Sequence, residues 1–205
     1  MNPFVDFSFQ RLVYQACACA FILATHGFLL AFAARILGDR GPQHDGRLTL
    51  NPVSHLDPLG ALALAFTQFG WVKPVALERD ALAGRAAGPL LVALIALAGS
   101  LALGWLLWQL RPVAFGVLTG GAMGVTVVGL LETMAQTSLA FVLVNLIPIL
   151  PLTMGHLLRG IAPGAADRLD RFRFPVGVAM GGLILLGLSQ GMGAAMLRFS
   201  RGVFG

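Results

Sequence analysis

The chain has 205 residues, of which 57% are hydrophobic and only 11% are charged. A soluble domain of ordinary composition has about a quarter charged residues, so this composition excludes a water-soluble globular fold. The net charge of +5 comes from Lys and Arg residues spread over loops and segment ends. Without a basic stripe, these charges argue against nucleic acid as a partner and favour contact with a lipid bilayer.

Long apolar runs predict the membrane segments. The first, residues 12–34, is bracketed by Arg11 and Arg35 and has about the 20 residues that a bilayer core requires. Residues 58–72 are apolar but short, so we expect a tilted or re-entrant segment there. Four further full spans are expected at residues 88–110, 113–131, 137–158 and 174–197.

Together these segments predict an all-α membrane protein, a polytopic helix bundle of about five to six membrane segments. Its loops carry turn-forming and charged residues, and no long polar segment remains for a second domain. We therefore expect a single integral membrane domain over residues 1–205. Lys and Arg occur in every major loop, so the positive-inside rule leaves the orientation open.

Glycines recur at four-residue spacing in two of the predicted spans. They are Gly116, Gly120 and Gly124 in one span, and Gly177 and Gly181 in the last. Small residues at this spacing let helices approach closely in lipid. The pattern fits internal packing of the bundle, and it also fits docking of a partner helix on these glycines.

Four short motifs follow one another along the chain. They read HGFLL at 26–30, GRLTLNPVSHLDPLG at 46–60, LAGS at 97–100 and NLIPILPLTMGH at 145–156. In this order they resemble the site-2 protease family of intramembrane zinc metalloproteases, in its compact bacterial branch. Members of that family carry HExxH, GRLTLNPxxHxDPxG, an Ala-Gly-Pro turn and NLxPxPxLDG. The likeness covers residues 12–158 and implies a site-2-protease-like core there, followed by the C-terminal span 174–197.

The resemblance also implies which residues to compare with the family's active site. In the family, the two His of HExxH and the Asp of LDG hold zinc, and the Glu acts as general base. Here His26 keeps the first ligand, Gly27 stands at the base, Leu30 at the second His and Thr153 at the Asp. Ser100 replaces the Pro of the turn. We therefore expect no catalytic residue, and neither zinc nor another cofactor.

Two functions follow from this comparison. The leading one is a catalytically inactive, site-2-protease-like protein that binds a partner transmembrane helix, or serves as an accessory subunit of a membrane protein complex. The alternative is an active intramembrane zinc metalloprotease whose non-standard ligands are His26, His55 and His156. The resemblance to the compact bacterial branch implies the bacterial cytoplasmic (inner) membrane.

Overall fold

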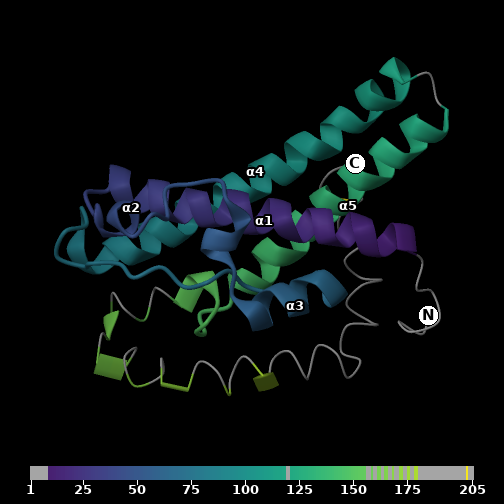
Figure 1. Ribbon diagram of the computed structural model, residues 1–205. Coiled ribbons are helices and arrows are strands. Elements are labelled where there is room, and N and C mark those ends of the chain that lie inside the picture. The colour runs from purple at the N-terminus through teal and green to yellow at the C-terminus, as the bar shows by residue number, and fades with distance from the viewer. Residues whose placement is uncertain are drawn as a thin grey trace.

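The computed structural model describes residues 9–118 and 121–155, together with single residues between 158 and 202. In this part of the chain the regular structure is entirely helical. Three of the helices are long and apolar enough to cross a membrane. They are α1 (Phe9–Ile36), α4 (Gly88–Val117) and α5 (Ala122–Asn145). Figure 1 shows α4 and α5 as a hairpin that packs against α1.

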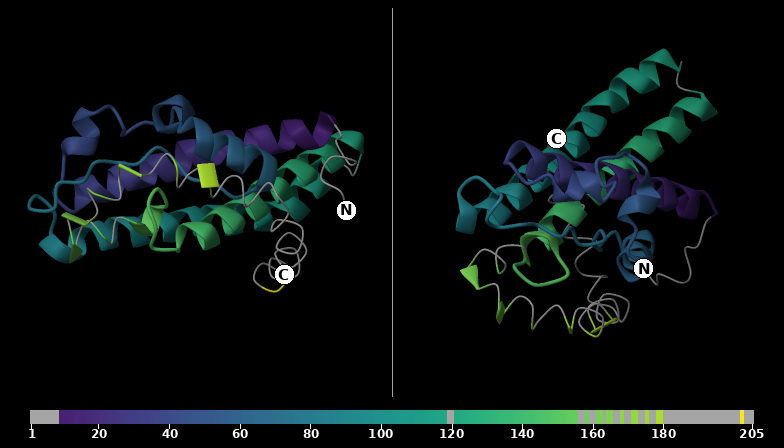
Figure 2. Two further views of the ribbon diagram at one scale, coloured as in Figure 1. Left: turned by 90° about the horizontal axis from the view of Figure 1, so that it is seen from below. Right: turned by 60° about the vertical axis from the view of Figure 1, so that its left-hand side comes forward.

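Five shorter elements complete the described part. They are α2 (Gly41–His44), the 3-10 turn η1 (Pro52–His55), α3 (Pro58–Thr67), and the 3-10 turns η2 (Arg85–Ala87) and η3 (Thr153–Gly155). In the views of Figures 1 and 2, α2 lies at the end where α1 finishes and α4 begins, and α3 lies alongside α1.

The first predicted span is confirmed, because α1 contains all of residues 12–34. Its buried positions recur every three or four residues and include Ala18, Ile22, His26, Leu30 and Ala33. This spacing places them on one face of a helix with 3.6 residues per turn. The face packs against α4 and α5 and brings His26 into the core.

The short apolar segment 58–72 is helical only over residues 58–67, as α3. Asp57 caps α3: its Oδ1 accepts from the backbone N–H groups of Leu59 at 3.1 Å and Gly60 at 3.0 Å. A helix of 10 residues is about 15 Å long, half the thickness of a bilayer core. By length, α3 does not cross a bilayer.

The expected break at residues 111–112 is wrong, since α4 continues through Pro112 to Val117. A proline inside a helix has no N–H for the carbonyl four residues earlier, here that of Trp108. Arg111 supplies the missing donor, because its Nε lies 3.0 Å from the Trp108 carbonyl oxygen. Its guanidinium also stacks on the Trp108 ring.

The expected break at residues 132–136 is wrong as well, because Glu132 lies well inside α5. Its carboxylate is held by Gln136, one turn on, with Nε2 3.0 Å from Oε1. Nη1 of Arg111 in α4 lies 3.5 Å from Glu132 Oε2. The three spans predicted at 88–110, 113–131 and 137–158 are therefore two helices, and α5 ends at Asn145.

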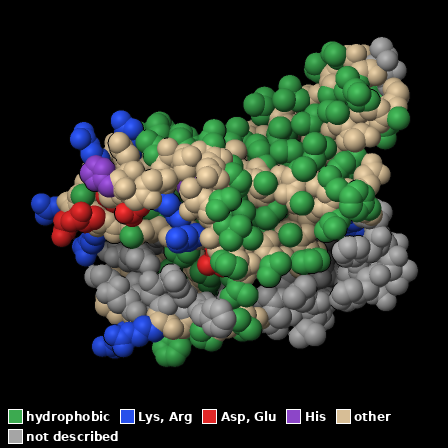
Figure 3. Space-filling view, in the orientation of Figure 1, with side chains coloured by type: hydrophobic (Ala, Val, Ile, Leu, Met, Phe, Trp, Pro, Cys, Tyr) green, Lys and Arg blue, Asp and Glu red, His purple; other side chains and the backbone are tan. Residues whose placement is uncertain are grey.

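The five to six predicted membrane segments are not confirmed, since the described residues contain three candidate spans. The predicted span 174–197 lies outside them apart from single positions. Most of the charged side chains visible in Figure 3 gather over α2 and the neighbouring loops, whereas the surface of α4 and the hairpin is largely apolar. This distribution is that of an integral membrane protein with one strongly polar end.

Candidate functional site

Three of the four motifs meet around the buried imidazole of His26. The residue lies midway along α1, Ser100 lies on the facing turn of α4, and Thr153 opens η3. His26 Nδ1 is 2.9 Å from Ser100 Oγ, and His26 Nε2 is 2.9 Å from Thr153 Oγ1. All three side chains are almost completely excluded from solvent. Each ring nitrogen of His26 therefore has a hydroxyl partner.

A second layer of hydrogen bonds orients Thr153. Asn145 Oδ1 accepts from both the backbone N–H and the hydroxyl of Thr153, each at 3.0 Å. Asn145 Nδ2 donates to the backbone carbonyls of Gly70 at 2.8 Å and Phe141 at 2.9 Å. These carbonyl partners fix the orientation of the amide, so the Thr153 hydroxyl proton points to Asn145.

The proton positions around His26 follow from this layer. The Thr153 hydroxyl donates its one hydrogen bond to Asn145 Oδ1, so its oxygen accepts from Nε2–H of His26. In a ring that carries its one proton on Nε2, Nδ1 has a lone pair, which accepts a hydrogen bond from the Ser100 hydroxyl. Ser100 Oγ also lies 2.9 Å from the Ala96 carbonyl, so two acceptors share its one proton. The result is a continuous hydrogen-bonded network in the core.

The space next to Gly27 is filled by His55. A Cβ placed on Gly27 would lie 2.1 Å from Cγ and 2.2 Å from Nδ1 of His55. Such distances are far below van der Waals contact, so His55 and a side chain at position 27 exclude each other in this arrangement. The position at which the resemblance expects a general base has neither a side chain nor room for one.

His55 itself is fully buried at the end of η1. Its Nε2 lies 2.9 Å from the Thr49 carbonyl and so carries the proton, whereas its buried Nδ1 has no hydrogen-bond partner. Burial lowers the pKa of His55, and the Arg47 guanidinium lowers it further, while the hydrogen bond to Thr49 acts in the opposite direction. The ring is therefore neutral near pH 7.

Arg47 holds the loop that carries His55. Its guanidinium donates to the carbonyls of Ser54, of Lys73 at 2.6 Å and of Pro74 at 3.4 Å. The Lys73 N–H in turn donates to the His55 carbonyl at 2.8 Å. These bonds tie the motif at 46–60 to the stretch that follows α3, and they seat His55 against α1. The sequence did not indicate this role of Arg47 or the central position of Asn145.

The residues around His26 do not fit zinc. Leu30, at the position of the second ligand, lies in the apolar core beside Ala33 and Val72. The polar groups bonded to the ring nitrogens of His26 are the hydroxyls of Ser100 and Thr153, whereas zinc sites use His, Cys and carboxylate ligands. Among the described residues, no group of three or more such side chains could hold a metal ion. His156 lies outside the described residues.

The glycines singled out by spacing are not those that the helix contacts require. Among the described residues, a Cβ on Gly116 would meet nothing within 4 Å, and one on Gly124 would make only ordinary contacts, the nearest at 3.5 Å. Packing within the described part of the chain therefore does not require glycine at either position. Close approach occurs instead at Gly104, where a Cβ would lie 2.7 Å from that of Ser138. Gly120, Gly177 and Gly181 lie outside the described residues.

Comparison with known proteins gives one relative. Over 165 residues, covering 80% of this chain and 75% of the relative, the chain is 26% identical to a Bacillus subtilis (strain 168) protein named "Putative zinc metalloprotease YwhC". No family model matches the chain. No solved structure matches it either. The similarity is consistent with a distant protease-like relationship.

Proposed function

We propose that this chain is a catalytically inactive relative of the site-2 proteases, which binds a transmembrane helix of another membrane protein. The proposed loss of catalysis rests on the hydrogen bonds that occupy both ring nitrogens of His26. Zinc hydrolysis requires three protein ligands, an open coordination position and a base. Here both nitrogens of the one retained ligand are bonded to hydroxyls, and His55 fills the space of the base.

The residues that stand at the family's motif positions are compatible with one another in this packing. A buried imidazole without partners costs free energy, because its polar atoms lose their bonds to water. The hydroxyls of Ser100 and Thr153 remove that cost. The missing side chain of Gly27 leaves space, which the ring of His55 occupies. A side chain reintroduced at position 27 would collide with the ring of His55, which supports the proposed loss of catalysis.

Binding of a partner helix is supported by the surface of the hairpin. Val113 and Val117 of α4 and Met123 and Val125 of α5 are exposed. Gly116 brings the backbone itself to this surface with open space beside it. A transmembrane helix with small residues could approach closely here. In this proposal the chain acts as an accessory subunit in a bacterial cytoplasmic membrane.

The partner proposal is tested by purifying the full chain in mild detergent beside two variants. Gly116→Leu fills the open space beside Gly116, whereas Val53→Leu enlarges an exposed side chain of η1, outside the hairpin. We expect a membrane protein at fixed ratio with the parent chain and Val53→Leu, and its loss with Gly116→Leu. A folded parent chain that purifies without any partner would contradict this role.

The name of the Bacillus relative favours a second candidate, a zinc protease with unusual ligands. That function requires bound zinc and a cleaved membrane substrate, both lost on His26→Ala. The hydroxyl partners of His26 oppose it, because they must leave before a metal could bind either nitrogen.

A further inference from the structure

Four exposed arginines lie at the end of the bundle where α1 finishes and α4 begins. Arg35 is in the last turn of α1, and Arg40 directly precedes α2. Arg79 and Arg85 lie in the stretch that leads into α4. All four side chains are exposed. Figure 3 shows Lys and Arg side chains gathered on the surface around α2. We call these four residues the arginine group.

Hydrogen bonds fix the stretch before α4 against the end of α1. The Glu78 N–H donates to Oδ2 of the buried Asp39 at 2.8 Å. The Ala83 N–H donates to the Leu37 carbonyl at 2.6 Å. Each bond joins a residue next to the start of α4 to a residue that directly follows α1. The arginine group is therefore held together at one end of the bundle.

The positive charges of this group are not neutralised within the described part of the chain. Among residues 9–118 and 121–155, the ion pair is that of Arg111 with Glu132, in the hairpin. Asp39, the buried carboxylate of this end, accepts from the backbone N–H groups of Gly41 and Glu78. The four guanidinium groups therefore face the surroundings of the protein.

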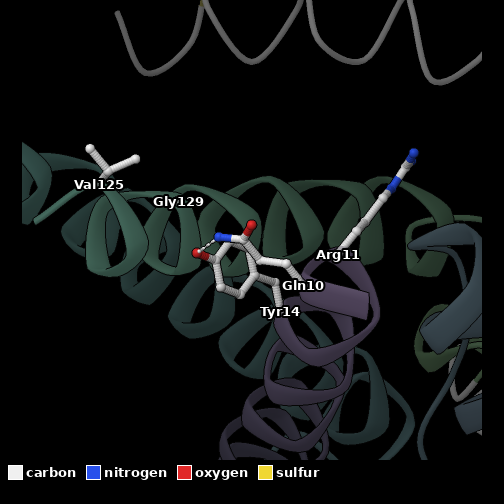
Figure 4. A pocket seen from close by; sticks show the side chains of 5 residues that line it. All are labelled: Gln10, Arg11, Tyr14, Val125 and Gly129. Carbon is white, nitrogen blue, oxygen red and sulfur yellow. Dashed lines mark hydrogen bonds between the residues drawn. The ribbon is translucent and has the colours of Figure 1, made fainter. Parts of the chain in front are cut away.

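The opposite end of the bundle has few charges. Figure 4 shows the shallow cavity where α1 begins, in which Gln10 Nε2 lies 2.6 Å from the Tyr14 hydroxyl and Arg11 extends to one side. Arg11 is the one cation among the residues that line this cavity. Residues 118–121, which join α4 to α5, read LTGG and carry no charge. Arg111 was expected in a loop, but it lies inside α4.

We propose that the arginine group faces the cytoplasm and contacts the anionic headgroups of the cytoplasmic leaflet, so that the α4–α5 turn faces the other side of the membrane. Lys and Arg in connections of up to about 60 residues stay on the cytoplasmic side, and residues 37–87 are such a connection. Anionic lipids also give that leaflet a negative surface potential, which attracts cations. This orientation goes beyond the proposed function and does not depend on it.

The orientation assigns a side of the membrane to each functional region. His26 lies roughly 14 Å from Arg35 along α1, and half of a bilayer core is about 15 Å thick. The hydrogen-bonded network of His26 is therefore in the cytoplasmic half. The open space beside Gly116 is near the α4–α5 turn, so the partner helix proposed above would contact the outer half.

Labelling of single cysteines in bacterial spheroplasts that express the full chain tests this orientation. The two native cysteines are first removed by Cys17→Ala and Cys19→Ala. Asp80→Cys then reports on the arginine group, and Gly121→Cys, where a Cβ would meet nothing within 4 Å, reports on the turn. A membrane-impermeant maleimide should label Gly121→Cys in intact spheroplasts, and Asp80→Cys only after permeabilisation. The reverse pattern, or labelling of both ends in intact spheroplasts, would overturn the orientation.

A second pair of cysteines gives the same readout if one of the first variants does not fold. Ala81→Cys and Met123→Cys replace exposed residues close to the first two positions. We expect Met123→Cys to be labelled from outside and Ala81→Cys to be protected until the membrane is permeabilised. Labelling of Ala81→Cys in intact spheroplasts would contradict the proposal.

Charge variants test whether the arginine group sets the orientation, with Ala81→Cys as the reporter. Replacing all four arginines by glutamine should raise the ratio of inverted to native chains by up to about fivefold for each residue. Glu78→Gln with Asp80→Asn is the matched control, because carboxylates in the same connection contribute little to the rule. Unchanged labelling in the arginine variant, or an equal rise in the control, would overturn the role of these cations.

Discussion

The imidazole of His55 occupies the space into which a side chain on Gly27 would project, with its Cγ 2.1 Å from the Cβ position of residue 27. The two residues lie far apart in the sequence, in separate motifs. Each limits what the other can be, because a side chain at position 27 requires His55 to move. This contact joins the loop at 46–57 to the helix that carries His26.

Gly27→Ala should therefore destabilise the protein, by about 1–3 kcal/mol, the usual cost of forcing extra atoms into a packed core. In a His55→Ala background the same change should cost much less, because the ring that it strikes is gone. Thermal unfolding in detergent of both single variants and the double variant measures this coupling. Strictly additive shifts in the unfolding midpoint would mean that the two positions do not share one space.

Thr153→Val removes the hydroxyl and keeps the shape of the side chain. The N–H of His26 and the oxygen of Asn145 each lose a buried partner, so we expect a loss of about 1–3 kcal/mol in the free energy of unfolding. Thr126→Val is the matched control, because the Thr126 hydroxyl bonds only to its own helix at an exposed position. Similar small effects of both changes would show that the network contributes little stability.

The stability of the fold should depend on pH through His55. Burial holds its pKa below the ordinary value of 6.5, so the unfolded chain binds a proton first as the pH falls. This contribution to stability is complete above pH 6.5 and is lost below it, by up to about 1.4 kcal/mol per pH unit. The midpoint of unfolding should be measured from about pH 7.5 down to about pH 5. We expect it to fall less over this range in His55→Gln than in the parent chain. Parallel curves would exclude His55 as the titrating group.

The hydrogen bond from Arg111 to the Trp108 carbonyl, next to Pro112 in α4, gives a further prediction. Arg111→Met removes the donor to the Trp108 carbonyl and the ion pair with Glu132, and should cost about 1–2 kcal/mol. With Pro112→Ala the backbone N–H returns and bonds that carbonyl, so Arg111→Met should then cost less. Unfolding midpoints of the four chains measure the difference. An equal cost in both backgrounds would mean that Arg111 does not substitute for the missing N–H.

Much of the fold could be predicted from residue patterns, and the errors have local causes. The apolar run of α1 between two arginines and the short segment of α3 were predicted from length alone. Neither Pro112 nor Glu132 interrupts its helix. Arg111 donates to the Trp108 carbonyl that Pro112 leaves without a backbone N–H, and Gln136 and Arg111 bind the Glu132 carboxylate. Such contacts depend on which helices face each other, and the pattern of apolar residues along the sequence does not predict that.

The candidate site was only partly predictable. The resemblance identified His26 as the retained ligand and Gly27, Leu30 and Thr153 as altered positions. That Ser100 and Thr153 would bond the two nitrogens of His26 depends on the meeting of α4 and η3 with α1, which sequence spacing does not give. The same holds for His55, whose ring reaches Gly27 only because Arg47 folds its loop against neighbouring carbonyls.

The most direct test of the proposed loss of catalysis is the metal content of the full chain, purified in detergent, incubated with zinc and washed, and then measured by elemental mass spectrometry beside His26→Ala. Because hydroxyls bind both nitrogens of His26, we expect far less than one zinc per chain and the same value in the variant. Zinc near one per chain in the parent, lost in His26→Ala, would contradict the proposal and identify His26 as a metal ligand.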